Sequence, residues 1–238
     1  MPPTKLKKPS LQLDVHRQSL DAQAADSLRE AVLTGQLQPG ERITEEIVAE
    51  SLGLSRGTIR ASLRKLAHEG LIVQEPYKGY SVRSLSSRDA WELFTLRHAL
   101  EAFAARMLAE LMNDEKRRRL DKAYDQVIAA VNSGSRSKAV AADFELHRTI
   151  VELTGHSTLL AHYMQIASQV RLYQTLVSKF LSLQDYVKFH QPLIDALREK
   201  RADDAEKISA GHNTADGERL VDWLRQDEER RQKLADVS

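Results

Sequence analysis

The sequence predicts a mainly α-helical fold, in which an N-terminal winged helix-turn-helix precedes an all-α antiparallel bundle of six helices. Three observations lead to this fold class. The 238 residues include only 10 glycines and 6 prolines, about 7% against a usual ~12%, which disfavours turn-rich β folds. The first 83 residues read as helices followed by a hairpin, and the residues after them show only helical periods.

The composition is that of a globular chain with balanced charge. Lys and Arg total 35 and Asp and Glu 34, a net charge of +1, so nucleic-acid binding would need a local basic patch. The absence of cysteine excludes disulfides, a thiolate nucleophile and a cysteine zinc site, and is consistent with a reducing cytosol. The chain has no run of apolar residues long enough to span a membrane and no secretory signal. We therefore expect a cytoplasmic protein without membrane contact.

The N-terminal domain is expected to cover residues 16–83, after a disordered arm at 1–15. Apolar residues at three- and four-residue spacing predict a helix over 17–34. Thr44 can cap a short second helix over 45–51. These two helices begin the expected DNA-binding layout.

A third helix and a hairpin complete the domain. Ser55 can cap the helix predicted over 56–68. Two β-like stretches, 71–74 and 80–83, are joined by Glu-Pro-Tyr-Lys-Gly and predict a hairpin. Three helices with a tight turn and then a hairpin are the layout of a winged helix-turn-helix.

Residues 84–87 are the expected linker, and the bundle domain is expected over 88–225. Ser86 and Asp89 have the spacing of a capping box at its first helix. The six helices are predicted over 87–111, 114–132, 137–154, 157–180, 184–200 and 203–225. Short loops between them favour an antiparallel bundle. The charged residues 226–238 are expected to form a fraying tail.

The third helix carries a concentration of basic residues without an acid before Glu69. Arginine can bridge guanine O6 and N7 or bind phosphate, and hydroxyls with free N–H groups at a helix start can also hold phosphate. A basic residue and a glycine at the hairpin tip suit a wing against the DNA backbone or the minor groove. The alternative is a solvated basic face, but the order of elements favours DNA binding. The candidate contacts are Ser55, Arg56, Thr58, Arg60, Lys78 and Gly79.

Four polar residues interrupt the apolar stripes of the predicted bundle helices. Asp143 lies one helical turn before His147, and His190 and His212 lie on the stripes of two later helices. Buried polar groups need partners, and one carboxylate with three imidazoles can ligate a divalent transition metal. The alternative is a set of hydrogen-bonded core histidines. The identity of the metal stays open between Zn²⁺, Ni²⁺ and Mn²⁺.

Two arginines are candidates for holding an effector. Arg97 lies on an apolar stripe of the 87–111 helix, where it can pair with Glu101 one turn on or bind an effector carboxylate through two bonds. Arg171 is the second candidate. Pro192 lies inside the helix that carries His190, which predicts either a kink or a later start of that helix.

The run from Leu37 to Val82 contains a dense set of motifs. They are the Pro39-Gly40 turn, the helix start Ser55-Arg56-x-Thr58-Ile59-Arg60, the spacing Leu63-x-x-Leu66 and the exit Glu69-Gly70-Leu71-Ile72. With these the run resembles the DNA-binding domain of GntR-family bacterial transcription regulators. The resemblance implies operator contacts by Arg56, Thr58, Arg60 and Gly79. Some members carry an arginine where this chain has Glu46, so that contact is not implied here.

The C-terminal pattern resembles a second domain. Asp-x-x-x-His, one histidine on each of two later helices, and Leu-Arg-x-x-Leu-Glu around Arg97 are similar to the FCD domain of the FadR-type branch, and six helices is the VanR-like number. The resemblance implies that Asp143, His147, His190 and His212 bind a metal in the bundle centre. It also supports Arg97 as an effector contact.

Together these patterns predict a ligand-responsive transcription regulator rather than an enzyme. It would act as a repressor, bind a pseudo-palindromic operator as a homodimer, and hold a small carboxylate metabolite near the metal. One alternative is a regulator that senses the metal ion itself. Another is a metal-dependent hydrolase fused to a DNA-binding module, against which the lack of an H-E-x-x-H motif counts.

Overall fold

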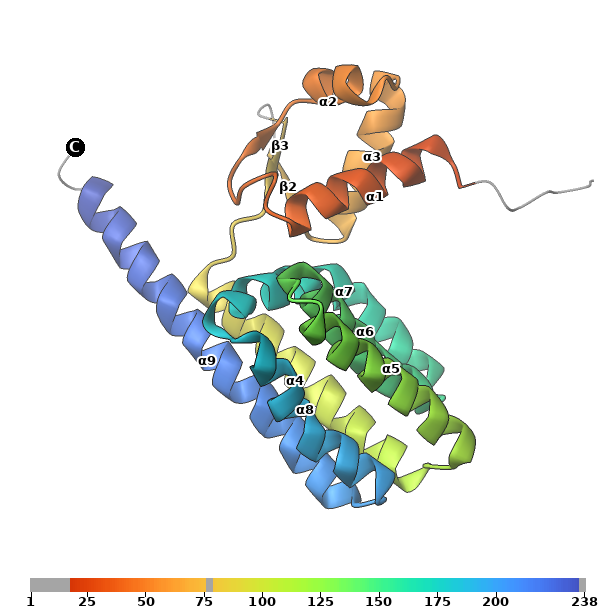
Figure 1. Cartoon of the computed structure of the whole chain (residues 1–238). Coiled ribbons are helices and arrows are strands. Elements are labelled where there is room, and N and C mark those ends of the chain that lie inside the picture. Colours follow the sequence, from red (N-terminus) through yellow and green to blue (C-terminus); the bar gives the residue numbers. More distant parts are fainter. Residues whose placement is uncertain (1–17, 76–78, 236–238) are drawn as a thin grey trace, which may run out of the picture.

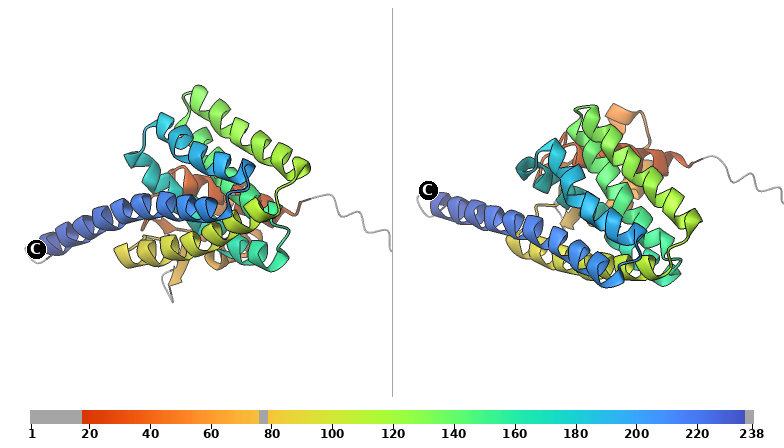
Figure 2. Two further views of the ribbon diagram at one scale, coloured as in Figure 1. Left: turned by 90° about the horizontal axis from the view of Figure 1, so that it is seen from below. Right: turned by 60° about the horizontal axis from the view of Figure 1, so that its bottom comes forward.

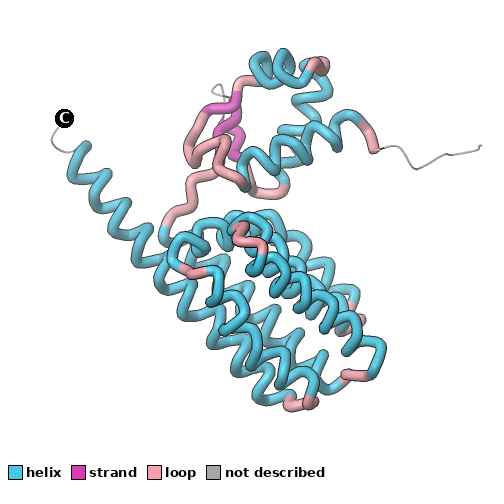
Figure 3. Tube along the Cα trace, viewed as in Figure 1, coloured by secondary structure: helices cyan, strands magenta, loops and turns pink. Residues whose placement is uncertain are grey.

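The computed structural model describes residues 18–75 and 79–235, and it confirms a mainly α protein with a winged helix-turn-helix before a six-helix bundle (Figures 1 and 3). The expected arm at 1–15 and the wing residue Lys78 lie outside the described residues. The N-terminal domain consists of α1 (Leu20–Leu33), β1 (Arg42–Ile43), α2 (Glu45–Leu52), α3 (Arg56–His68), β2 (Ile72–Glu75) and β3 (Gly79–Val82).

The sequence did not predict β1. Its two residues are too few to show an alternating pattern, so only the fold reveals it. β1 pairs antiparallel with β3, with Ile43 opposite Tyr80, and the sheet order is β1-β3-β2. Ile43, Tyr80 and Val82 are buried, so the small sheet covers one side of the domain's core.

The helix caps of the N-terminal domain agree with the expected boundaries but not with every expected bond. Ser55 caps α3 by accepting a hydrogen bond from the Thr58 amide. Thr44 occupies the N-cap position of α2, yet its side chain makes no capping bond. Gly53 ends α2 with a φ of 63°, a left-handed conformation that favours glycine.

The bundle consists of α4 (Ser87–Glu110), α5 (Asp114–Asn132), α6 (Arg136–Leu153), α7 (Ser157–Val177), α8 (Leu183–Arg198) and α9 (Ala202–Ala235), with a short 3₁₀ turn at Ser178–Phe180 after α7. The capping box of Ser86 and Asp89 at the start of α4 is present as predicted. α4 and α9 lie side by side (Figure 2). They pack so tightly that a Cβ at Gly217 would overlap the ring of Phe94.

The expected fraying of residues 226–238 is wrong for the described part, because α9 continues to Ala235. Its end projects beyond the bundle (Figures 1 and 2). Charged residues with high helix propensity form ion pairs one turn apart, as Arg230 and Arg231 do with Asp227. Glu228 also accepts hydrogen bonds from the backbone and hydroxyl of Ser87. These contacts hold the charged segment in a helix.

Pro192 lies within α8, which begins at Leu183 and ends at Arg198. A later start of this helix is therefore excluded. His190 precedes the proline and is buried. Its ring Nδ1 lies 2.5 Å from the carbonyl oxygen of Tyr186, one turn back along the helix.

The protein has two apolar cores, one in each domain. The larger core fills the bundle and is formed by side chains from all six helices, α4 to α9. The smaller core lies between α1, α3 and the sheet, and it includes Leu172 from α7 of the bundle. The two domains therefore share one buried side chain. Along the described chain, we find no helix with the length and apolar character that a membrane span requires.

Candidate nucleic-acid interface and metal centre

The start of α3 presents the residues that the sequence predicts for reading DNA. Ser55 accepts a hydrogen bond from the Thr58 amide at 3.1 Å, and the two hydroxyl oxygens lie 2.9 Å apart. Arg56 and Arg60 are exposed on the same helix. Ile59 is fully buried, and because it lies between these residues it fixes which side of α3 faces solvent.

Two acids of α2, which sequence reasoning did not connect with α3, hold these arginines. Arg60 donates to both carboxylate oxygens of Glu45, with an Nη2 to Oε2 distance of 2.8 Å, and Arg56 pairs with Glu46. The hydrogen bond from Arg60 lowers the pKa of Glu45. The pairing depends on how α2 crosses α3, so periodicity within either helix gives no signal for it.

The wing contributes Gly79, the first residue of β3, with a φ of 89° and open space around its Cα. This backbone conformation favours glycine. A backbone without a side chain can approach a ligand closely. Lys78, the other predicted wing contact, is not among the described residues.

The structure brings Asp143, His147, His190 and His212 together in the bundle. Each offers a ligand atom, and these atoms all lie within 4.8 Å of one another. The Nε2 of His190 lies 3.0 Å from Asp143 Oδ1 and 3.0 Å from His147 Nε2, while His147 Nε2 lies 3.7 Å from Asp143 Oδ1. The four residues come from α6, α8 and α9, as helical spacing predicts.

Hydrogen bonds fix which ring nitrogens face the centre of this cluster. The Nδ1 of His147 lies 2.9 Å from Glu101 Oε2, and the Nδ1 of His190 lies 2.5 Å from the Tyr186 carbonyl oxygen. Ionised carboxylates and carbonyls only accept hydrogen bonds, so both Nδ1 atoms carry a proton. In neutral rings the two Nε2 atoms therefore present lone pairs to each other and to Asp143.

Burial and neighbouring charge shift the protonation of the cluster in opposite directions. Burial raises the pKa of Asp143. The charge of His190 and its hydrogen bond lower this pKa by more than burial raises it, so the pKa of Asp143 lies well below its usual range. Burial lowers the pKa of His190, and the Asp143 carboxylate raises it by more. Burial and the two other rings lower the pKa of His212 well below its usual value. His212 is thus held neutral, the form that ligates metals.

Arg97 forms the ion pair with Glu101 that the sequence offered as one interpretation. Its Nε donates to Glu101 Oε1 at 2.8 Å, and the Tyr163 hydroxyl donates to the same oxygen at 2.8 Å. Because Glu101 also accepts from His147, the arginine and a cluster ligand share one carboxylate. Sequence reasoning assigned Glu101 only the role of partner to Arg97.

A cavity of about 20 Å³ lies beside the cluster, lined by Arg97, Asp143, Gln174, His190 and His212 among others. This is room for about one water molecule. The Nη2 of Arg97 is buried and has no hydrogen-bond partner in the described part of the chain. Gln174, which the sequence analysis missed, donates its amide to Asp143 Oδ2.

Arg171 does not join this cavity. Its guanidinium lies 3.8 Å from Glu30 of α1 and 5.8 Å from the centre of the Phe144 ring. It lines a separate crevice between α1, α6 and α7. The structure thus separates the two arginines that the sequence proposed for the effector, placing Arg97 beside the cluster and Arg171 between the domains.

A winged helix-turn-helix with a basic reading helix, joined to a six-helix bundle with a buried Asp and His cluster, defines a transcription regulator with a separate sensing domain. Comparison with known proteins agrees with this class. Residues 20–82 match the gntR family of bacterial regulatory proteins, and residues 92–215 match the FCD domain. The chain belongs to the GntR family of transcription regulators, with an FCD domain as its C-terminal part.

Individual relatives are distant but extend over most of the chain. An HTH-type transcriptional regulator of Bacillus subtilis, YdhC, is 24% identical over 86% of this chain and 92% of its own length. A probable D-xylose utilization operon transcriptional repressor of Paenarthrobacter nicotinovorans is 26% identical over 84% of this chain and 88% of its own. The solved structure of E. coli McbR/YncC covers 89% of this chain and 100% of its own, with a TM-score of 0.71 at 18% identity. That structure shares the fold.

Proposed function

We propose that this regulator binds a pseudo-palindromic operator as a homodimer, and that a metal in the Asp143 cluster helps it bind a small carboxylate effector. The observation that carries the metal is the convergence of potential ligand atoms. Two imidazole Nε2 atoms and a carboxylate oxygen meet at 3.0–3.7 Å. In neutral rings the lone pairs at such distances repel, and either a metal ion between them or a proton on one Nε2 relieves this repulsion.

The geometry fits a metal of the transition series. Ligand atoms about 2.0–2.2 Å from a tetrahedral Zn²⁺ lie roughly 3.3–3.5 Å from one another, within the range of distances in the cluster. Ligating histidines usually donate their other N–H to a carboxylate or a carbonyl, as His147 and His190 do here. Asp143 and the three histidines would hold the metal, and an ion that accepts more than four ligands would also supply a position for an oxygen of the effector.

Arg97 supports a carboxylate as the class of effector. Arg97 lines the cavity beside the cluster, its buried Nη2 has no hydrogen-bond partner in the described chain, and guanidinium groups bind carboxylates strongly. One relative is a gluconate operon transcriptional repressor of Bacillus licheniformis, 25% identical over 79% of this chain, and gluconate is a small carboxylate. Since the cavity has room for about one water molecule, an organic effector requires the bundle to open.

The narrow cavity also favours a second candidate, a regulator that senses the metal ion itself. An ion needs no opening of the bundle. Titrating metal against operator binding without an organic ligand separates the two candidates. A change in operator affinity with metal alone supports the second, and tightly bound metal without such a change supports the first.

The DNA-binding role supports both a homodimer and a cytoplasmic location of the protein. One short recognition helix reads only a half-site, so a palindromic operator needs two copies. Some of the relatives are named repressors, and we extend that role to this chain. Operator binding would place the protein in the bacterial cytoplasm.

The metal proposal is tested by elemental analysis of the purified protein. Wild type is expected to carry about one transition-metal ion per chain, and the double variant Asp143→Ala with His147→Ala is expected to carry none, because two of the four ligands are lost. His98→Ala is the matched control, since His98 contacts Thr214 instead of the cluster. Full metal content in the double variant would refute the site.

A further inference from the structure

Helix α7 has two faces that belong to different domains. Tyr173, Gln174 and Val177 line the cavity beside the cluster. Leu172, their neighbour in sequence, is only 4% exposed and packs in the core of the DNA-binding domain. Adjacent positions on a helix point about 100° apart, so a single turn of α7 reaches both sites.

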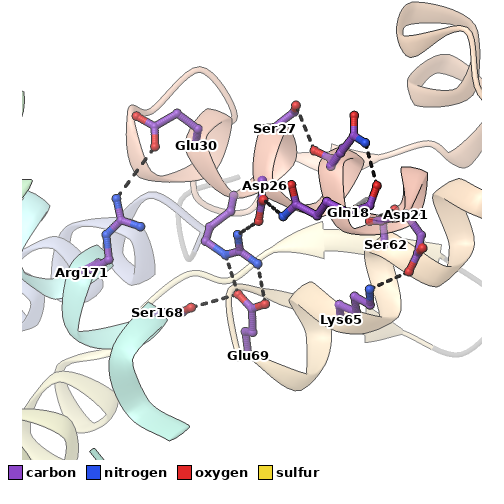
Figure 4. A network of polar contacts seen from close by, with 12 residues as sticks. Gln18, Asp21, Asp26, Ser27, Glu30, Ser62, Lys65, Glu69, Ser168 and Arg171 are labelled. Atoms are coloured by element: carbon purple, nitrogen blue, oxygen red, sulfur yellow. Dashed lines mark hydrogen bonds and ion pairs between the residues drawn. The ribbon is translucent and has the colours of Figure 1, made fainter. Parts of the chain in front are cut away.

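Polar contacts fix the outer face of α7 to the DNA-binding domain. The Ser168 hydroxyl donates to Glu69 Oε2 at 2.9 Å, and Arg171 lies 3.8 Å from Glu30 of α1 (Figure 4). Glu69 in turn accepts two hydrogen bonds from Arg29, at 2.8 and 2.6 Å. One carboxylate thus joins α7 to α1.

The contact lies at the end of the reading helix. Glu69 is the C-cap of α3, and the next residue, Gly70, has a φ of 73°. A Cβ at Gly70 would come within 2.5 Å of the Gln169 amide on α7. The turn that ends α3 therefore rests directly on α7, with no space for a side chain between them.

The inner face of α7 contacts the cluster itself. Gln174 donates its amide to Asp143 Oδ2, the second oxygen of the carboxylate that faces the histidines. Its other terminal atom, Oε1, is buried and without a hydrogen-bond partner in the described chain. A ligand that draws Asp143 towards the histidines therefore acts on the hydrogen bond that holds this part of α7.

We propose that α7 transmits the state of the Asp143 cluster to the DNA-binding domain, through Gln174 on its inner face and Leu172 and Ser168 on its outer face. This inference rests on the proposed metal-binding function. A helix moves as a rigid element, so a shift at Gln174 displaces Leu172 within the other core. If α7 has a second position in the metal-free protein, the transmitted effect equals the preference of the ligand for one position over the other.

Amide hydrogen exchange of the full-length protein tests the coupling, with Zn²⁺ alone as the probe. Metal-free protein is prepared with a chelator and compared with the Zn²⁺-loaded form. In wild type, loading should slow exchange over residues 170–177 and also over 24–33 and 66–72. We expect at least about a fivefold change in the DNA-binding domain, the lower end of usual coupling between sites.

Two variants separate transmission from metal binding. In Leu172→Ala and in Ser168→Ala, loading should still slow exchange over 170–177, but the change in the DNA-binding domain should be lost. Met164→Ala, an exposed position on the same helix, is the matched control and should respond as wild type does. The readout is the difference between loaded and metal-free protein, so a general loss of stability in Leu172→Ala does not imitate the result.

The outcomes distinguish this inference from the proposed function. If loading with Zn²⁺ slows exchange over 170–177 in wild type but not in the DNA-binding domain, the coupling is overturned and the metal site stands. The same holds if Leu172→Ala and Ser168→Ala both keep the full response of the DNA-binding domain. If Zn²⁺ does not bind, the proposed metal function fails, and Gln174→Leu in metal-free protein decides the coupling. The Gln174→Leu substitution should alter hydrogen exchange over residues 66–72, and adding Leu172→Ala to it should abolish this effect. Unaltered exchange over 66–72 in Gln174→Leu overturns the inference.

Discussion

At the scale of single residues, the ion pair of Arg60 bears on the DNA contact that the sequence predicts for this residue. Its guanidinium is bonded to Glu45 but remains exposed. Exposed ion pairs contribute little to stability, so exchanging this pair for a base or phosphate contact costs little. The pair fixes the direction of the side chain before DNA arrives.

We expect Arg60→Ala to weaken operator binding about 10- to 100-fold, because the proposed bidentate contact to guanine would be lost. Fluorescence anisotropy with operator and random duplexes measures both affinity and preference. Arg118→Ala, which removes an exposed arginine of α5, should leave binding unchanged. An operator affinity equal to that of wild type in Arg60→Ala would remove this residue from the readout.

The sequence predicts the members of the Asp143 cluster but not their surroundings. Helical spacing alone places Asp143 and His147 on one stripe and His190 on another, because side chains one turn apart share a face. The role of Glu101 as a partner of both Arg97 and His147 depends on how α4 crosses α6. Such cross-helix contacts leave no period in the sequence, which is also why Gln174 was missed.

At the scale of elements, the two N-caps show that a capping residue need not make a capping bond. Ser86 and Asp89 exchange hydrogen bonds at 3.0 Å at the start of α4, whereas Thr44 makes none at α2. From the sequence, Ser86 and Thr44 are both predicted to cap their helices, because the sequence shows only residue type and spacing. The side-chain direction that decides between them is set by packing.

We predict that Ser86→Ala lowers the free energy of unfolding by about 1 kcal/mol, because α4 loses its capping box. Thr44→Ala, the matched control at a cap position without the bond, should change it by less than about 0.5 kcal/mol. Urea unfolding followed by circular dichroism measures both. Equal losses in the two variants would contradict the assignment of the bonds.

At the scale of the whole molecule, we expect the contact between the domains to depend on pH through Glu69. Burial raises the pKa of this carboxyl, but hydrogen bonds from Arg29 and Ser168 lower it by more, so its pKa in the folded protein lies below the usual value of a glutamate. A carboxyl whose pKa is lower in the folded than in the unfolded chain stabilises the fold at pH values above its pKa in the unfolded chain. This contribution is lost as the pH falls through its pKa in the folded chain. Acid should therefore loosen the contact between the domains.

We expect Glu69→Gln to lower the free energy of unfolding by about 1–2 kcal/mol at pH 7, since charged hydrogen bonds are lost. The difference from wild type should shrink as the pH falls below about 4.5. Urea titrations at several pH values measure it, and Glu50→Gln at an exposed position of α2 is the control. A difference that stays constant down to strongly acidic pH would show that the carboxylate is not the group that matters.

The outer face of α4 exposes apolar side chains and is our candidate surface for a dimer. Leu96 is 46% exposed and Phe103 is 47% exposed, and they lie one heptad apart on one face, the spacing of a helix–helix seam. Leu93 lies three residues before Leu96 on the same apolar stripe of α4. The structure divides it, because Leu93 is buried while these two side chains face outwards.

If this face joins two copies, Leu96→Arg with Phe103→Arg should convert a dimer into a monomer, because burying two guanidinium groups without partners is unfavourable. Light scattering after size exclusion should show the mass of two chains for wild type and of one chain for the variant. Affinity for the full palindrome should fall, while affinity for a half-site stays the same, since each head still reads its own bases. Leu111→Arg, at an exposed apolar residue beyond the end of α4, controls for added charge. A variant that remains dimeric would assign the dimer contact to another surface.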